Sequence, residues 1–245
     1  MTRLRGGAVI AAGLLLAVTG CTAGTGGSGG AAGDGGDGGD GGGGEGAALA
    51  AVRELTVKGR APRTGYDRDR FGTPWADTDS NRCGTRDDIL ERDLTDVEFG
   101  DGHCEVVSGT LAPDPYTGRD IPFERGRSQV DIDHLVALSD AWQKGARQWD
   151  PGKRIAFAND PLNLLAVDAG TNRAKGDGDT ATWLPPDKGY RCAYVAGQVA
   201  VKRKYGLWVT AAERDAMTRV LSGCPDEPLP TSGNPTAAPP RFTAD

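Results

Sequence analysis

The sequence contains only two histidines, His103 and His134, among its 245 residues, and it has no Cys-x-x-Cys pair. A structural zinc site is therefore not expected, because such sites are usually built from closely spaced cysteines and histidines. No internal repeat, helix-turn-helix or zinc finger is recognisable, so nothing in the sequence supports recognition of specific bases. The formal net charge of −6 also argues against a broad basic surface.

The chain also lacks an apolar run long enough to span a membrane. The stretch from Ala8 to Val18 is too short for a span, but it follows two arginines, as in a signal peptide. It ends at Val18-Thr19-Gly20-Cys21, which resembles a bacterial lipobox. We therefore expect residues 1–20 to be a lipoprotein signal peptide and Cys21 to carry a lipid that anchors the chain to the outer face of the cell membrane. The alternative is a plain signal peptide and a secreted protein, with Cys21 there by chance.

Aliphatic residues larger than alanine are absent from Ala23 to Gly46, so this Gly- and Asp-rich stretch cannot bury a core. We therefore expect residues 21–46 to form a flexible tether and the proline-rich residues 225–245 to form a disordered tail. Residues 47–224 remain for one folded domain, whose charged side chains sum to a net charge of −2. Strand-like and helix-like stretches are mixed along this domain, which predicts an α+β fold with short strands.

Apart from Cys21, four cysteines remain, and an even number in an exported chain predicts two disulfides. Three pairings are possible. We favour Cys83–Cys104 and Cys192–Cys224, because each joins neighbouring cysteines along the chain. In the chain-entropy model, closing a loop of this size contributes roughly 3 kcal/mol to the free energy of unfolding.

The stretch Val130-Asp131-Ile132-Asp133-His134-Leu135-Val136 is unusual, because two acids precede a histidine at the end of an expected strand. Side chains alternate along a strand, so Asp133 and His134 should point to opposite faces and share a site only if the backbone bends. One interpretation is a functional site. The other is a structural histidine that caps the strand and hydrogen-bonds a carboxylate.

A second polar stretch follows the short apolar strand that starts at Asn163-Leu164-Leu165. Asn172 and Lys175 lie three residues apart on the expected helix and therefore share one face. Their amide and ammonium groups suit a metal ion and a phosphate. The alternative is the start of a solvated helix whose polar side chains face water.

Together these stretches resemble the HNH family of the ββα-metal nucleases. Asp-His ends one strand, an Asn lies near the second strand, and another Asn lies on the following helix. Within that family the sequence is similar to the C-terminal domain type of GmrSD restriction endonucleases, over roughly residues 50–224. The HNH domain of RNA-guided CRISPR nucleases has a similar Asp-x-Asp-His and Asn-Arg-x-Lys arrangement. The motifs that carry the resemblance are Thr64-Gly65-Tyr66-Asp67-Arg68, Thr85-Arg86, Asp114-Pro115-Tyr116-Thr117-Gly118, Asp133-His134-Leu135-Val136-Ala137-Leu138-Ser139, Ala141-Trp142, Phe157-Ala158-Asn159-Asp160-Pro161, Asn163-Leu164-Leu165, Asn172-Arg173-Ala174-Lys175-Gly176-Asp177 and Trp183-Leu184-Pro185-Pro186.

The resemblance implies a ββα-metal core and a role for each residue of the HNH motif. His134 would be the general base, and Asp133 and Asn172 would hold a divalent metal. Because Asn172 stands where many relatives have His, the oxygen donors favour Mg²⁺, or Mn²⁺, over zinc. Asn163 would brace the loop that carries the base.

Three further positions have a less defined role in this resemblance. Lys175 would contact a phosphate, and Asp131 would orient a neighbouring group or be structural. Ala137 stands where relatives often have Pro, which leaves the stiffness of the loop after His134 open.

The implied function is a metal-dependent endonuclease that hydrolyses phosphodiester bonds of DNA, or of RNA, as a monomer and with weak or no sequence specificity. Unperturbed histidine has a pKa of about 6.5, so cleavage should rise between about pH 6 and 7 if His134 is the base. His103, in a glycine-bearing turn beside Cys104, should be dispensable. The alternative is a non-catalytic cell-surface lipoprotein that uses the same fold as a binding module.

Overall fold

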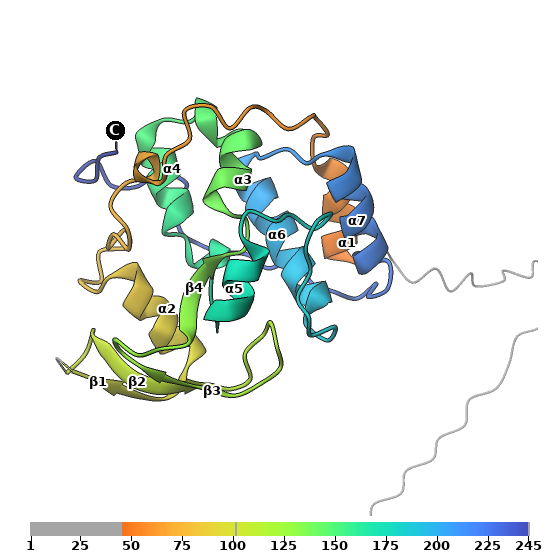
Figure 1. Ribbon diagram of the computed structural model, residues 1–245. Helices are drawn as coiled ribbons and strands as arrows, with labels where there is room; N and C mark the ends of the chain where they lie inside the picture. Colours follow the sequence, from red (N-terminus) through yellow and green to blue (C-terminus); the bar gives the residue numbers. More distant parts are fainter. Residues whose placement is uncertain (1–45, 101, 245) are drawn as a thin grey trace, which may run out of the picture. The chain divides into compact units, whose positions relative to one another are not determined.

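The computed structural model describes residues 46–100 and 102–244 of the chain (Figure 1). The chain divides into two units, Met1–Gly41 and Gly42–Asp245, and the described residues all belong to the second. The expected signal peptide, the lipidation site at Cys21 and nearly all of the expected tether lie outside the described residues. None of the described helices combines the length and the apolar character of a membrane-spanning helix.

Two small antiparallel sheets and a set of short helices make up the described unit (Figure 1). The first sheet contains β1 (Thr95–Phe99), β2 (Val106–Leu111) and β3 (Ile121–Glu124), and the second contains β4 (Val130–His134) and β5 (Leu164–Asp168). The α-helices are α1 (Ala47–Glu54), α2 (Thr85–Asp93), α3 (Leu138–Gln143), α4 (Pro151–Ala158), α5 (Ala169–Lys175), α6 (Arg191–Tyr205) and α7 (Ala211–Leu221). Short 3₁₀ turns are η1 (Arg68–Phe71), η2 (Ala146–Gln148) and η3 (Pro161–Asn163). The α+β class that the sequence predicted is confirmed.

Strand β4 separates an apolar side from an acidic side. Val130 and Ile132 are buried in a core shared with β5, α2 and the three-stranded sheet. Asp131 and Asp133 occupy the alternate positions, and their carboxylates contact side chains of α5. The period of two that places apolar residues in this core therefore also lines two carboxylates along α5, which lies beside β4 in Figure 1.

Helix α6 forms the centre of the helical part, with α1 and α7 packed along it (Figure 1). Val195 and Val199 of α6 are completely buried, and Val52 of α1 and Met217 of α7 close over them. These helices bury their apolar faces on one another, which is the main source of their stability in water.

A group of ionisable side chains is also buried among the helices. The Lys144 ammonium lies 2.6 to 2.8 Å from a carboxylate oxygen of each of three acids, and the Lys202 ammonium lies 3.0 and 3.1 Å from two of the same acids. A half-exposed arginine completes the group at its edge, 2.9 and 2.7 Å from two of the acids. We call this set the helical ion cluster; it consists of Arg60, Asp140, Lys144, Asp179, Lys202 and Glu213.

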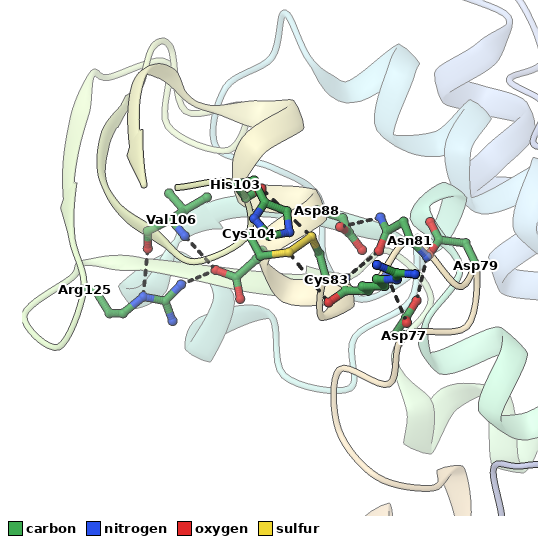
Figure 2. Close-up of a disulfide and its surroundings, with 11 residues drawn as sticks. Asp77, Asp79, Asn81, Cys83, Asp88, His103, Cys104, Val106 and Arg125 are labelled. Carbon is green, nitrogen blue, oxygen red and sulfur yellow. Dashed lines mark hydrogen bonds and ion pairs between the residues drawn. A yellow bond between two sulfur atoms is a disulfide. The ribbon is translucent and has the colours of Figure 1, made fainter. Parts of the chain in front are cut away.

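Both disulfides that the sequence predicted are present. Cys83–Cys104 ties the loop before α2 to the segment between β1 and β2, and Cys192–Cys224 ties the first turn of α6 to the segment after α7. Figure 2 shows the first bridge with His103 beside it. Each disulfide therefore joins a segment next to a helix to a second segment that lies outside the regular elements or at a helix end.

The C-terminal segment, 225–244, follows the surface without a helix or strand. The described part of this segment has polar contacts with the rest of the domain. The Ser232 hydroxyl donates to Asp160 Oδ1 at 3.2 Å, and the Arg241 guanidinium donates to the Asp77 carbonyl at 2.9 Å. Proline and glycine disfavour regular secondary structure, but they do not prevent polar groups of the segment from docking on the domain.

Candidate active site

Strands β4 and β5 pair and, with helix α5, form a ββα unit; residues 135–163 separate the two strands in the chain. Helix α5 begins at Ala169, directly after β5, because Asp168 ends the strand and caps the helix. The Asp168 carboxylate accepts the Thr171 amide hydrogen at 2.7 Å. Since no residues connect the strand to the helix, α5 lies close to β4 and brings its side chains to the acidic side of that strand.

His134 ends β4, and its imidazole is held in one orientation. Its Nε2 lies 2.9 Å from the carbonyl oxygen of Ala158, and its ring stacks on Trp75 with ring centres 6.3 Å apart. A carbonyl oxygen only accepts, so Nε2 must carry the proton. In the neutral ring, Nδ1 is then the basic nitrogen, and the end of α4 fixes the tautomer that a general base requires.

Burial is the main cause of a large pKa change at His134. It lowers the pKa from its ordinary 6.5 to about 3, against the hydrogen bond to Ala158, which raises the pKa; the Arg68 and Lys175 charges lower it further. The imidazole is therefore neutral across the physiological pH range. The rise of cleavage between pH 6 and 7 inferred from an unperturbed histidine does not apply to this environment, because His134 has no proton to lose there.

Buried polar side chains brace the loop that follows His134. Asn163 accepts the Val136 amide hydrogen at 2.9 Å through Oδ1 and donates to the Val136 carbonyl at 3.4 Å. Gln198 of α6 donates to the Leu135 carbonyl at 2.7 Å. Ala137 has φ of −56°, an angle that proline would also adopt. The loop is thus fixed by Asn163 and Gln198 without the ring that a proline would supply.

Asp133 has partners on both of its carboxylate oxygens. The Lys175 ammonium lies 2.9 Å from Oδ1 and 2.8 Å from Oδ2, and it also donates to the His134 carbonyl at 2.7 Å. The Tyr116 hydroxyl donates to Oδ2 at 2.5 Å. Burial, followed by the charge of Asp133, raises the pKa of Tyr116 well above its ordinary value, so it remains a donor.

The buried ion pair changes the role that the sequence gave to Lys175. The Lys175 side chain is 0% exposed, so it does not reach a substrate phosphate in this conformation. Tyr116 is a further neighbour of Asp133, and the sequence motif itself gave it no role. Its only signal was its place in the Asp114–Gly118 turn, one of the motifs that carry the resemblance.

A pocket of about 230 Å³ opens at the end of β4 and brings the three expected catalytic residues together. Asp133 and His134 turn to different partners, on α5 and at the end of α4, yet both border this pocket. Asn172 borders it from α5 and donates to Asp131 at 3.4 Å. The other lining residues are Tyr66, Arg68, Ile132, Ala137, Leu138, Gly176 and Asp177.

The donor chemistry of this pocket fits a divalent cation. Carboxylate and amide oxygens of Asp133 and Asn172 are the ligand types that Mg²⁺ and Mn²⁺ prefer. The Lys175 ammonium already compensates the charge of Asp133, so a bound cation would have to share this carboxylate with Lys175 or displace it. The pocket therefore fits a metal in ligand type, with Lys175 as a competitor for one ligand.

His103 lies outside this site. It is exposed, and its ring nitrogen comes within 4.8 Å of the sulfurs of Cys83 and Cys104, next to which it is drawn in Figure 2. Both sulfurs belong to the disulfide and are not thiolates, which are the form that binds zinc. The group is therefore not a zinc site.

Comparison with known proteins identifies the family. A secreted protein of Arthroderma benhamiae, described as uncharacterized, is 43% identical over 172 residues, which are 69% of this chain and 81% of that protein. No solved structure matches the chain. Residues 84–220, which include β4, β5, α5 and all three expected catalytic residues, match the C-terminal domain of GmrSD restriction endonucleases. The chain therefore belongs to the GmrSD C-terminal domain family, which is an HNH-type nuclease family.

Proposed function

We propose that this protein is a metal-dependent endonuclease that hydrolyses phosphodiester bonds, with DNA as the expected substrate and RNA as the alternative. The observation that carries the proposal is the fixed, neutral imidazole of His134 at the edge of a pocket shared with Asp133 and Asn172. Membership of a nuclease family supports a nucleic acid as the substrate. The protein acts as a monomer in this proposal.

His134 takes a proton from the attacking water through Nδ1. The water oxygen then bonds to phosphorus while the bond from phosphorus to the 3′ oxygen breaks, and the leaving oxygen takes a proton from solvent. The products are a 5′-phosphate and a 3′-hydroxyl. A positioned general base supplies roughly 10²- to 10⁴-fold of the rate. Mg²⁺ or Mn²⁺ held by Asp133 and Asn172 would supply Lewis-acid stabilisation of negative charge on the phosphate and the leaving oxygen.

The two disulfides indicate that the protein works in an oxidising, extracytoplasmic compartment. The secreted relative supports the same location. Lipidation at Cys21, and with it attachment to the outer face of the membrane, remains the finer part of this proposal. Mass spectrometry of the mature N-terminus, with and without Cys21→Ser, tests it; an unmodified Cys21 would contradict it.

A non-catalytic binding module is the second candidate, because one observation favours it. The Lys175 ammonium occupies both oxygens of Asp133, the expected metal ligand. A binding module would keep this pair intact and would show no turnover in the presence of any divalent metal.

Nicking of a supercoiled plasmid decides between the two candidates. Wild-type protein should nick the plasmid with Mg²⁺ or Mn²⁺ and stop when a chelator is in excess. Absence of cleavage with either metal would favour the binding module, and full activity in chelator would contradict the metal mechanism.

The two histidines provide a matched pair of variants for the same assay. His134→Ala should lower the initial rate by a factor on the order of 10² or more, because it removes the base. His103→Ala should stay near wild type, because His103 lies outside the pocket. Melting curves control for folding. An active His134→Ala protein, or a folded but inactive His103→Ala protein, would show that the base is assigned to the wrong residue.

The expected metal ligands are tested separately from substrate binding. Asp133→Ala and Asn172→Ala should reduce cleavage far more than they reduce binding of a labelled oligonucleotide, because the metal acts mainly on the charge that develops during the reaction. Equal losses in both measurements would indicate a binding role only.

A further inference from the structure

Arg68 borders the pocket next to His134 and has no assigned role. It is the one arginine or lysine among the described residues that line this pocket. Its side chain is exposed, and in the described part of the chain it has neither a hydrogen bond nor an ion pair. It lines this pocket together with His134. The pocket therefore has a free guanidinium beside the expected base.

The turn that carries Arg68 is firmly attached to the core. Phe71, at the end of η1, is buried against Trp142 and Phe157, with ring centres 6.4 and 6.1 Å apart. Arg154 of α4 donates to the Arg70 carbonyl at 2.7 Å. The backbone of η1 is thus fixed from two sides, and Arg68 is presented to the pocket from a rigid support, as groups that bind a reacting centre require.

The charges around the pocket favour an anion beside Arg68. Asp133 is already compensated by Lys175, with 2.8 Å between the charged atoms. Asp177 forms its described ion pair with Arg63, at 3.6 Å, and not with Arg68. Asp67 and Asp69 flank Arg68 in the chain, but neither forms an ion pair with it in the described part of the structure. A phosphate diester would supply the missing negative charge.

We propose that Arg68 binds the non-bridging oxygens of the scissile phosphate and holds it beside Nδ1 of His134. The planar guanidinium donates two parallel hydrogen bonds to such oxygens, which fixes both position and orientation. Arg68 thereby takes the phosphate-binding role that the sequence had assigned to the buried Lys175. This inference rests on the proposed nuclease function and adds a catalytic residue to it.

The test compares Arg68→Ala and Arg68→Lys with a control from the same turn, Arg70→Ala. Arg70→Ala removes the same charge as Arg68→Ala. The Arg70 guanidinium, however, lies over Trp142, 5.9 Å from the ring centre, and does not line the pocket. With a metal and a labelled duplex, Arg68→Ala should lower kcat about 10²- to 10³-fold, the range for loss of one preorganised donor. Arg68→Lys should recover part of this loss, and Arg70→Ala should stay near wild type. An unchanged kcat in folded Arg68→Ala, judged by its melting curve, would overturn the inference.

Two further measurements separate phosphate binding from a structural role. In chelator, where no cleavage occurs, the slope of log affinity against log salt should become less negative by about 0.9 in Arg68→Ala, as expected for one lost phosphate contact. Guanidinium added at concentrations far below those that unfold the protein should restore cleavage by Arg68→Ala. An unchanged salt slope together with no rescue would overturn the inference.

The outcome for wild type keeps the two proposals apart. If wild-type protein cleaves with metal and Arg68→Ala cleaves equally well, the role of Arg68 is wrong and the nuclease function stands. If wild-type protein does not cleave with Mg²⁺ or Mn²⁺, the nuclease function fails, and the role of Arg68 fails with it.

Discussion

Lysine ammonium groups are buried in two regions of this molecule. In the helical ion cluster, Lys144 and Lys202 are both 0% exposed and are held by three buried acids. In the ββα unit, Lys175 is equally buried, and its partner Asp133 is 7% exposed. The side chains are of the same kind and the distances are similar, but in the ββα unit the carboxylate partner, Asp133, also borders a pocket.

The two regions differ in how their buried charges are compensated. The helical ion cluster balances three cations against three acids, so each charge has partners inside the protein. Burial alone raises the pKa of Asp179, but Lys144 and Arg60 outweigh it and hold this pKa at about 2. Asp133 instead faces a space that a ligand can enter, beside a neutral histidine. Buried ion pairs alone do not mark a functional site; access and a neighbouring base distinguish this one.

Lys144→Met gives the largest expected change in stability. It leaves three buried carboxylates without one of their cationic partners, so the free energy of unfolding should fall by about 3–5 kcal/mol. Urea unfolding measures this change. Lys188→Met, at an exposed position, is the control and should change it by less than about 0.5 kcal/mol. The folded fraction of Lys144→Met should retain any nuclease activity; selective loss of activity would link the two regions.

The free energy of unfolding, measured in chelator as the pH is lowered, should fall in two pH ranges, one for each region. The pKa of His134 is about 3 in the folded chain and 6.5 ordinarily, so the unfolded chain binds a proton first and stability falls from about pH 6.5 downward. The pKa of Asp179 is about 2 against an ordinary 3.8, so its contribution, on the order of 2 kcal/mol, is present above pH 3.8 and is lost as the pH falls toward 2.

His134→Ala tells these two contributions apart. It should flatten the fall in stability between about pH 6.5 and 4 and leave the fall below pH 4 in place. Urea midpoints measured at each pH provide the readout. An unchanged upper range in His134→Ala would mean that another group titrates there.

Lys175→Met should have a smaller effect than Lys144→Met, with a metal dependence of its own. Asp133 keeps its hydrogen bond to Tyr116 and borders the pocket, so the loss should be about 1–3 kcal/mol. With Lys175 removed, Mn²⁺ should raise the melting temperature more than it does in wild type, because the competing ammonium is gone. In Lys144→Met, Mn²⁺ should add no more than in wild type. Equal Mn²⁺ shifts in all three proteins would contradict competition at Asp133.

Arg60→Met should give the smallest effect. The Arg60 side chain is 33% exposed and lies at the edge of the helical ion cluster, where water screens its charge. We expect a loss of at most about 1 kcal/mol in urea unfolding. A loss as large as that of Lys144→Met would show that the edge of the cluster is as shielded as its centre.

Sequence patterns predicted the parts of the fold that depend on neighbours along the chain. The alternation in β4, the short strand before α5 and the spacing of the cysteines correctly predicted an α+β fold with two disulfides. Asn163, expected to brace the loop after His134, lies on the Val136 backbone.

Local sequence patterns could not predict contacts between segments that are distant along the chain. Trp75 stacks on a histidine 59 positions further along the chain, and Tyr116 reaches Asp133 from a turn between two strands. From the sequence alone, Lys175 was expected on the surface. Its pairing with Asp133 could not be predicted, because it depends on how α5 lies against β4. The large change in the pKa of His134 also follows from burial that local sequence does not encode.

The two disulfides have a consequence for how the protein is produced. Together they contribute on the order of 6 kcal/mol in the chain-entropy model, which is comparable to the whole stability of a typical domain. In a reducing cytoplasm the chain lacks this contribution, so it should be largely unfolded, a state suited to translocation and to chaperones. Recombinant expression should therefore yield active protein only from an oxidising host compartment or after oxidative refolding, and dithiothreitol should lower its melting temperature steeply.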